Sequence, residues 1–161
     1  MTPMRLYIVR HAKARQDSPT GRDADRPLKD RGHRQAEALG TYFASRTPSP
    51  MLVLSSPYLR ARETAEHIWS ALDLDPQLDD RLSADRHLHD YLDVIADLAG
   101  CSCAAIVGHN PLVARLVAVL LEGPTAATPQ HETARVVALD LEDPMNPLAA
   151  ATLAETYRPD A

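Results

Sequence analysis

Short apolar runs alternate with helical patterns along this chain, and that alternation restricts the possible folds more than any other feature. Residues 6–9 form the first run, which has no polar residue at alternate positions. Residues 51–55 and 103–108 form similar runs. Runs of this kind are typical of strands buried on both faces, as in a parallel sheet between two layers of helices. We therefore predict an α/β fold of three layers around a mostly parallel central sheet.

The segments between these runs carry helical spacing. A helix is expected to begin near Lys29, with Ala36, Leu39 and Phe43 on its inner face. A second helix follows residues 51–55, and a third is predicted over residues 86–98. A fourth helix follows residues 103–108, and strands over 135–141 and 151–157 complete the expected set, the last at an edge of the sheet.

Two helix starts carry a polar residue followed by proline. Ser56 is expected to be an N-cap, with Pro57 at the first helical position, where the missing N–H costs nothing. Asn110 and Pro111 repeat the pattern at the fourth helix. Both helices would then begin directly after a buried strand.

Length and charge limit the class of protein. A chain of 161 residues with 45% hydrophobic residues is about the size of one globular domain, so we expect a single domain over residues 1–161. No run approaches the roughly 20 apolar residues of a membrane helix, and no signal-peptide pattern is present, which predicts a cytoplasmic protein without a membrane partner. The net charge of −5 argues against nucleic-acid binding.

Basic residues stand where three predicted strands give way to helices. Arg10 and His11 follow the first strand, Arg60 lies in the first turn of the second helix, and His109 precedes the fourth helix. Ligands of open α/β sheets bind at the carboxyl ends of the strands, where these junctions can meet. Helix N-termini and arginine side chains both favour phosphate oxygens. The pattern predicts a phosphate pocket that contains a histidine nucleophile.

Three motifs carry a family resemblance. They are Val9-Arg10-His11-Ala12, the segment from Ser55 to Ala65 with the sequence SSPYLRARETA, and Val107-Gly108-His109-Asn110-Pro111. In this order they resemble the signatures of the histidine phosphatase superfamily, which implies a phosphoglycerate mutase-like fold. Residues 25–28, 31–32 and 132–134, together with the short length, resemble its SixA-type phosphohistidine phosphatase branch.

The resemblance implies a role for each matching residue. His11 would be the nucleophile that takes the phosphoryl group, and Arg10 and Arg60 would bind its oxygens. His109 would hydrogen-bond the same group, and Arg26, in the long polar segment over residues 14–27, would add a further phosphate contact. The implied mechanism is covalent catalysis, in which phosphorylated His11 would be hydrolysed to release inorganic phosphate. No metal or other cofactor is expected, because guanidinium groups supply the positive charge.

One departure from the family pattern bears on the substrate. Larger superfamily members that cleave phosphate esters supply a glutamate as general acid after the second helix. Residues 78–85 offer no clear match, although Asp80 and Asp85 are alternatives for that role. An imidazole leaving group needs this proton less than an alkoxide does. The missing acid therefore favours a P–N substrate or an activated ester such as an aryl phosphate. The substrate that we expect is a phosphohistidine on a partner protein, such as a phosphorelay component.

Two other functions stay open at this point. One is a phosphomonoesterase that acts on a small phosphorylated molecule, which a comparison of substrates would distinguish. The other is a non-catalytic module that binds phosphate or phosphohistidine, in which replacement of His11 by alanine would leave the biological effect intact.

Overall fold

The computed structural model describes residues 3–159. Six strands form one sheet in the order β3-β2-β4-β1-β5-β6. The strands are β1 (Met4–Arg10), β2 (Leu52–Ser55), β3 (Gln77–Leu78), β4 (Cys103–Gly108), β5 (Val136–Leu141) and β6 (Ala151–Tyr157). The helices are α1 (Asp30–Ala44), α2 (Leu59–Leu72), α3 (Leu88–Asp97) and α4 (Leu112–Glu122), with short 3-10 turns η1 (Asp23–Asp25) and η2 (Asp80–Leu82). Among these described helices, none is long and apolar enough to cross a membrane.

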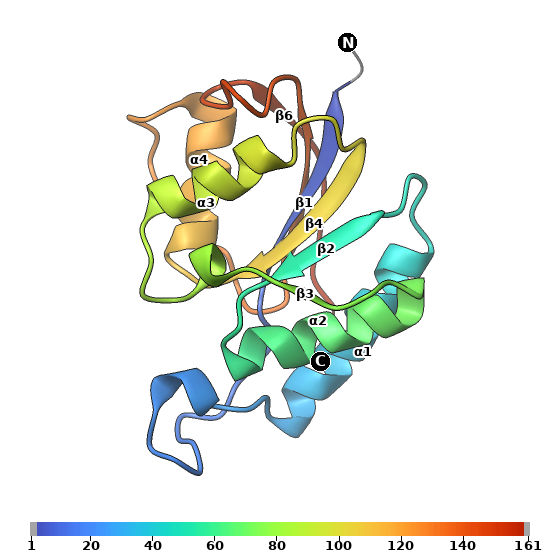
Figure 1. Cartoon of the computed structure of the whole chain (residues 1–161), viewed down its shortest axis with the longest axis vertical. Helices are drawn as coiled ribbons and strands as arrows, with labels where there is room; N and C mark the ends of the chain where they lie inside the picture. The colour runs from blue at the N-terminus through green and yellow to red at the C-terminus, as the bar shows by residue number, and fades with distance from the viewer. Residues whose placement is uncertain (1–2, 160–161) are drawn as a thin grey trace.

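The sheet is mixed rather than fully parallel. Strands β1, β4, β2 and β3 pair in parallel. The buried apolar runs predict β1, β4 and β2, whereas no such run predicts the two-residue strand β3, whose residues are exposed. Strand β5 pairs antiparallel to β1, and β6 pairs antiparallel to β5 at the edge of the sheet (Figure 1). The fold is the three-layer α/β class that the sequence predicts.

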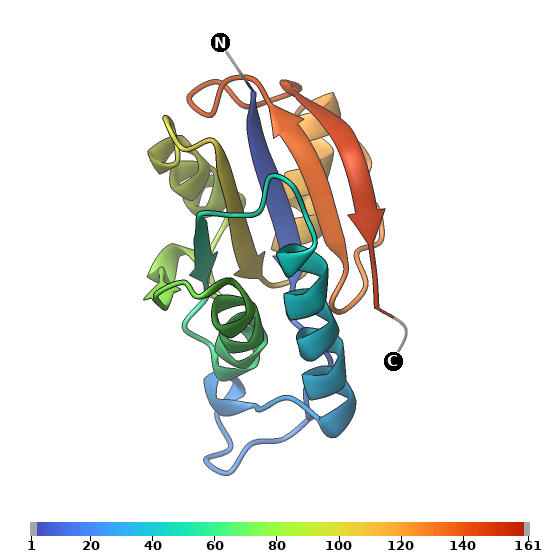
Figure 2. The ribbon, with the colours of Figure 1, turned by 90° about the vertical axis from the view of Figure 1, so that its right-hand side faces the viewer.

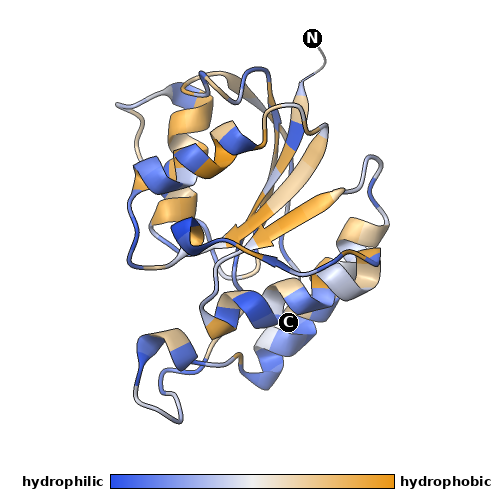
Figure 3. Ribbon diagram, viewed as in Figure 1, coloured by the Kyte–Doolittle hydropathy of each residue, from blue (hydrophilic) through white to orange (hydrophobic). Residues whose placement is uncertain are grey.

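Alternate residues of the central strands face opposite layers of helices. Tyr7 and Val9 of β1 pack in one core cluster with residues of α1 and α2. Leu6 and Ile8 pack in a second cluster with residues of α3 and α4. Figure 2 shows α1 and α4 on opposite faces of the sheet, and Figure 3 shows hydrophobic residues concentrated in the central strands. Burial on both faces explains why β1 lacks polar alternation.

The predicted capping of two helices is wrong in detail. Helix α2 begins at Leu59, so Tyr58 occupies the N-cap position and the Ser56–Pro57 step precedes the helix. The Ser56 hydroxyl accepts a hydrogen bond from the Tyr58 backbone N–H at 3.1 Å and also contacts the site described below. Helix α4 begins at Leu112, with Pro111 at the N-cap position, and the Asn110 side-chain N–H donates to the carbonyl oxygen of His131.

Candidate active site

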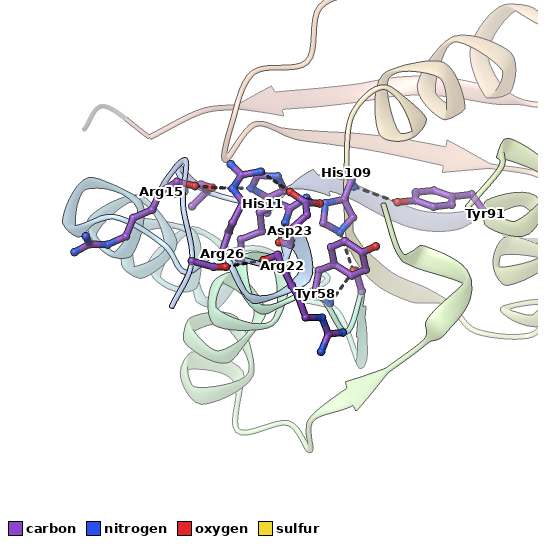
Figure 4. Close-up of polar contacts among 12 residues, drawn as sticks. His11, Arg15, Arg22, Asp23, Arg26, Tyr58, Tyr91 and His109 are labelled. Carbon is purple, nitrogen blue, oxygen red and sulfur yellow. Dashed lines mark hydrogen bonds and ion pairs between the residues drawn. The ribbon is translucent and has the colours of Figure 1, made fainter. Parts of the chain in front are cut away.

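The pairing of β1, β4 and β2 brings the three predicted junctions to one edge of the sheet. Arg10 lies opposite Gly108 in the register of β1 and β4, and the His11 backbone N–H donates to the Gly108 carbonyl at 3.1 Å. On the other side of β4, the Ser56 backbone N–H donates to the carbonyl of Val107 at 3.0 Å. His11, His109 and the start of α2 therefore meet beyond the carboxyl ends of these strands (Figures 1 and 4).

His11 is held in one tautomer by its own backbone. Its side chain is 7% exposed, and Nδ1 lies 2.7 Å from the carbonyl oxygen of Ala12. A carbonyl oxygen only accepts hydrogen bonds, so Nδ1 carries the ring proton and Nε2 keeps a free lone pair. Thr64 fixes the loop that follows, because its Oγ1 accepts from the Ala12 N–H at 3.0 Å. The geometry leaves Nε2 as the nucleophilic atom of His11.

The electrostatic surroundings of His11 keep it uncharged. Burial lowers its pKa to about 3, and the positive charges of Arg60, Arg10 and Arg26 act in the same direction. The hydrogen bond to Ala12 opposes this shift but does not overcome it. A neutral imidazole with an exposed lone pair is the form required for attack on phosphorus.

Arg60 and Arg10 bring permanent positive charge to the same place. Arg60 is 5% exposed, and it donates through Nη1 to the backbone oxygen of Asp23 at 2.8 Å and through Nη2 to that residue's carboxylate at 3.1 Å. Arg10 donates through Nη1 to the carbonyl of His131 at 3.2 Å, and its buried Nε has no partner among the described residues. A guanidinium has five N–H donors, so both arginines retain donors for an anion.

Asp23 joins the long polar segment to the site. Its carboxylate bridges Arg60 and Arg26, the latter through an Nη1 contact of 2.9 Å (Figure 4). Arg26 also donates through Nε to the carbonyl of Arg15 at 2.6 Å. Arg26 and Arg60 both lower the pKa of the Asp23 carboxyl, and Arg26 has the larger effect through its hydrogen bond. Asp23 is therefore ionised and places a negative charge beside the predicted phosphate pocket.

His109 lies next to His11, and a hydrogen bond from its backbone holds it in place. The two ring centroids are 5.2 Å apart, and the Tyr58 ring meets His109 edge-on at 5.1 Å. The His109 backbone N–H donates at 3.1 Å to the phenol oxygen of Tyr91, which itself donates to the carbonyl of Leu82 at 2.8 Å (Figure 4). Burial, followed by the effect of His11, lowers the pKa of His109 to about 2. This imidazole is also neutral.

The structure brings together the four side chains predicted from the motifs, namely His11, Arg10, Arg60 and His109. Their chemical roles stay predictions. Arg26 lies close enough to lower the pKa of His11, but two of its donors already bind Asp23 and the Arg15 backbone. Asp23 was missed in the sequence, because a single acidic residue in a polar loop gives no periodic signal.

The two candidate general acids lie on the surface. Asp80 belongs to the turn η2 and Asp85 follows it, and both residues are exposed. Asp85 lies near enough to the Tyr58 phenol to contribute to its raised pKa, although burial is the larger cause. Within residues 3–159, no group of three or more His, Cys, Asp and Glu side chains is arranged to hold a metal ion.

Comparisons with known proteins place this chain in a family. Residues 6–91 match the model of the histidine phosphatase superfamily (branch 1). The chain belongs to this superfamily, and it is a hydrolase of the phosphatase class.

Within the superfamily, the similarity to SixA covers most of the chain. The phosphohistidine phosphatase SixA of Escherichia coli (strain K12) is 28% identical over 149 residues, or 89% of each chain. A SixA homolog of Haemophilus influenzae is 31% identical over 129 residues, which cover 73% of this chain and 77% of that protein. The structure of the protein histidine phosphatase SixA complexed with tungstate superposes with a TM-score of 0.83 at 24% identity, over 96% of this chain and 97% of that one.

Ester phosphatases share the same fold. A mycobacterial glucosyl-3-phosphoglycerate phosphatase superposes with a TM-score of 0.76 at 19% identity, over 94% of this chain and 98% of that one. Fold similarity alone therefore does not select between a phosphohistidine and a phosphate ester.

Proposed function

We propose that this phosphatase hydrolyses phosphohistidine on a partner protein, through a phosphoryl group carried on Nε2 of His11 and without a metal ion. The observation that carries the proposal is the neutral His11, whose Nδ1 is committed to the Ala12 carbonyl while its Nε2 is free among arginines. The SixA proteins to which the chain is similar are named phosphohistidine phosphatases.

The reaction has two displacements. Nε2 of His11 attacks phosphorus, the P–N bond of the substrate breaks, and the substrate imidazole leaves with its electron pair. Water then attacks the phosphoryl group, the bond to His11 breaks, and inorganic phosphate leaves. Arg10 and Arg60 supply fixed positive charge to the phosphoryl oxygens in both steps, which is the main requirement in phosphoryl transfer.

The carboxylates near the site favour a P–N substrate. Asp23 is the carboxylate that contacts the site arginines, and its lowered pKa makes it a poor proton donor at neutral pH. Asp80 and Asp85, the two other candidates for a general acid, are both exposed on the surface. An alkoxide leaves slowly without a donated proton, whereas an imidazole does not need one to the same degree. A cytoplasmic location stays a prediction from the sequence.

The test compares kcat/KM on a phosphohistidine-bearing protein with kcat/KM on an alkyl phosphate and on an aryl phosphate. We expect the alkyl ester to be the poorest substrate, and we expect full activity after treatment with EDTA. A strong preference for the alkyl ester would refute the P–N assignment and favour the phosphomonoesterase. Loss of activity in EDTA that added metal restores would refute metal independence.

The His11→Ala variant separates the enzyme from the non-catalytic module. We expect it to lose turnover on all three substrates while it still binds inorganic phosphate through the arginines. A wild-type protein that binds phosphohistidine but turns over none of these substrates would instead be the binding module.

A further inference from the structure

The hydroxyl of Ser56 contacts the ring of His109. Its Oγ lies 2.8 Å from Nε2 of His109, and the Ser56 side chain is fully buried. The same oxygen accepts the Tyr58 backbone N–H at 3.1 Å. The second ring nitrogen of His109, Nδ1, is also buried and has no hydrogen-bond partner among the described residues.

The direction of the Ser56–His109 hydrogen bond follows from counting donors. The Tyr58 N–H can only donate, so the serine proton is directed elsewhere, and Nε2 of His109 is the acceptor found within reach of Ser56 Oγ. The opposite direction, from Nε2–H to Oγ, would leave the hydroxyl proton and the Nδ1 lone pair both buried without partners. An unsatisfied buried polar group is costly, so the serine donates and Nε2 accepts.

We propose, resting on the proposed function, that Ser56 is a positioning residue that fixes His109 in the tautomer with its proton on Nδ1. Since His109 lies beside His11, the unpartnered Nδ1–H is then the donor that binds an oxygen of the transferred phosphoryl group. The other tautomer would present a lone pair to the phosphoryl oxygens and would repel them. Ser56 therefore acts on the reaction through His109 and does not itself touch the substrate.

The direct test is the tautomer of His109 in the wild-type protein, read from the ¹⁵N chemical shifts of its ring nitrogens in long-range ¹H–¹⁵N correlation spectra. Burial keeps the ring neutral, so one nitrogen carries the single proton. We expect a protonated shift at Nδ1 and an unprotonated shift at Nε2. The reverse assignment overturns the proposal. This readout requires no turnover, so it is independent of whether phosphohistidine is the substrate.

The variants Ser56→Ala, Ser56→Thr and Ser55→Ala test the effect on catalysis. Ser55 is the matched control, because it is equally buried and its Oγ donates to the Ser56 carbonyl rather than to the site. We expect Ser56→Ala to lower kcat/KM on the order of 10- to 100-fold, the size of effect that loss of an orienting partner has for metal-bound histidines. The threonine variant should restore most of that loss.

Two results contradict the proposal in these variants. One is a loss of kcat/KM in Ser55→Ala as large as that in Ser56→Ala, which would indicate a general packing effect. The other is an Ser56→Ala protein that keeps both wild-type kcat/KM and the Nδ1–H tautomer of His109. If Ser56→Ala does not fold, the wild-type tautomer and the activity of Ser56→Thr decide the question.

Discussion

Buried, neutral His11 should make the protein less stable as the pH falls, and the size of this effect can be worked out from the structure. The folded pKa of His11 is lowered to about 3, whereas an unfolded histidine titrates at about 6.5. Below that value the unfolded chain binds a proton that the folded chain does not. The free energy of unfolding is therefore at its full value above about pH 6.5 and decreases as the pH falls toward 3.

The magnitude depends little on the folded pKa. Between pH 7 and pH 5 the folded His11 stays neutral, while the unfolded one takes up its proton over roughly 1.5 pH units. At about 1.4 kcal/mol per unit, this contributes about 2 kcal/mol to the loss of stability. Replacement of His11 by asparagine removes the titrating group. The variant should therefore lose about 2 kcal/mol less than the wild type over this interval.

Urea unfolding followed by circular dichroism gives the free energy of unfolding of each protein at both pH values. The test compares the change between the two pH values in each protein, so a difference in absolute stability between the proteins does not matter. His89→Asn is the control, since the His89 side chain is 72% exposed in the folded chain. An equal loss of stability in the wild type and in His11→Asn would refute the description of His11 as a buried neutral imidazole.

Three further substitutions test the contacts around the site. Gly108→Ala would place a methyl 2.5 Å from the Tyr91 phenol oxygen, which supports the neighbouring backbone of the site. Thermal denaturation should therefore show a loss of stability of about 1–3 kcal/mol, and kcat should fall. An unchanged melting temperature would contradict this contact. Gly32→Ala would place its methyl 2.0 Å from the Lys13 carbonyl oxygen, and we expect a comparable loss of stability by the same measurement. Wild-type stability of this variant would show that the backbone segments of Gly32 and Lys13 are not in contact. Asp23→Asn removes a negative charge beside the arginines of the site, so competitive inhibition by inorganic phosphate should strengthen roughly 3-fold. The effect is small because the Asp23 side chain is 57% exposed. Weaker inhibition would show instead that Asp23 holds the arginines in place.

The sequence predicts the layers of the fold and the meeting of the motifs for a clear physical reason. Strands that are buried on both faces must be apolar throughout, so β1 and β4 are recognisable from composition alone. Parallel strands then bring their carboxyl ends to one edge of the sheet. This pairing places Arg10, His11 and His109 near one another, independently of the conformation of the loops. Strand β5 shows the limit, because its apolar run carries no information on its direction, and it pairs antiparallel to β1.

The contacts within the site depend on distances that spacing does not encode. The sequence predicts Ser56 as a helix cap, because serine before proline usually has that role, but α2 begins three residues later and the hydroxyl contacts His109. Asp23 is one of 22 acidic residues, and its pairing with Arg60 depends on the path of the loop over residues 14–27. Both contacts arise from tertiary structure, so local propensity could not predict them.

The measurement that tests the central claim most directly is the location of the phosphoryl group in the trapped intermediate. The protein would be incubated briefly with a small phosphodonor such as phosphoramidate, quenched without acid, and analysed by mass spectrometry for the modified residue and by ³¹P and ¹⁵N NMR for the nitrogen. We predict a phosphoryl group on Nε2 of His11, because Nδ1 is committed to the Ala12 carbonyl. A phosphoryl group on His109 or on Nδ1 of His11, or release of phosphate from a His11→Ala protein at the wild-type rate, would contradict it.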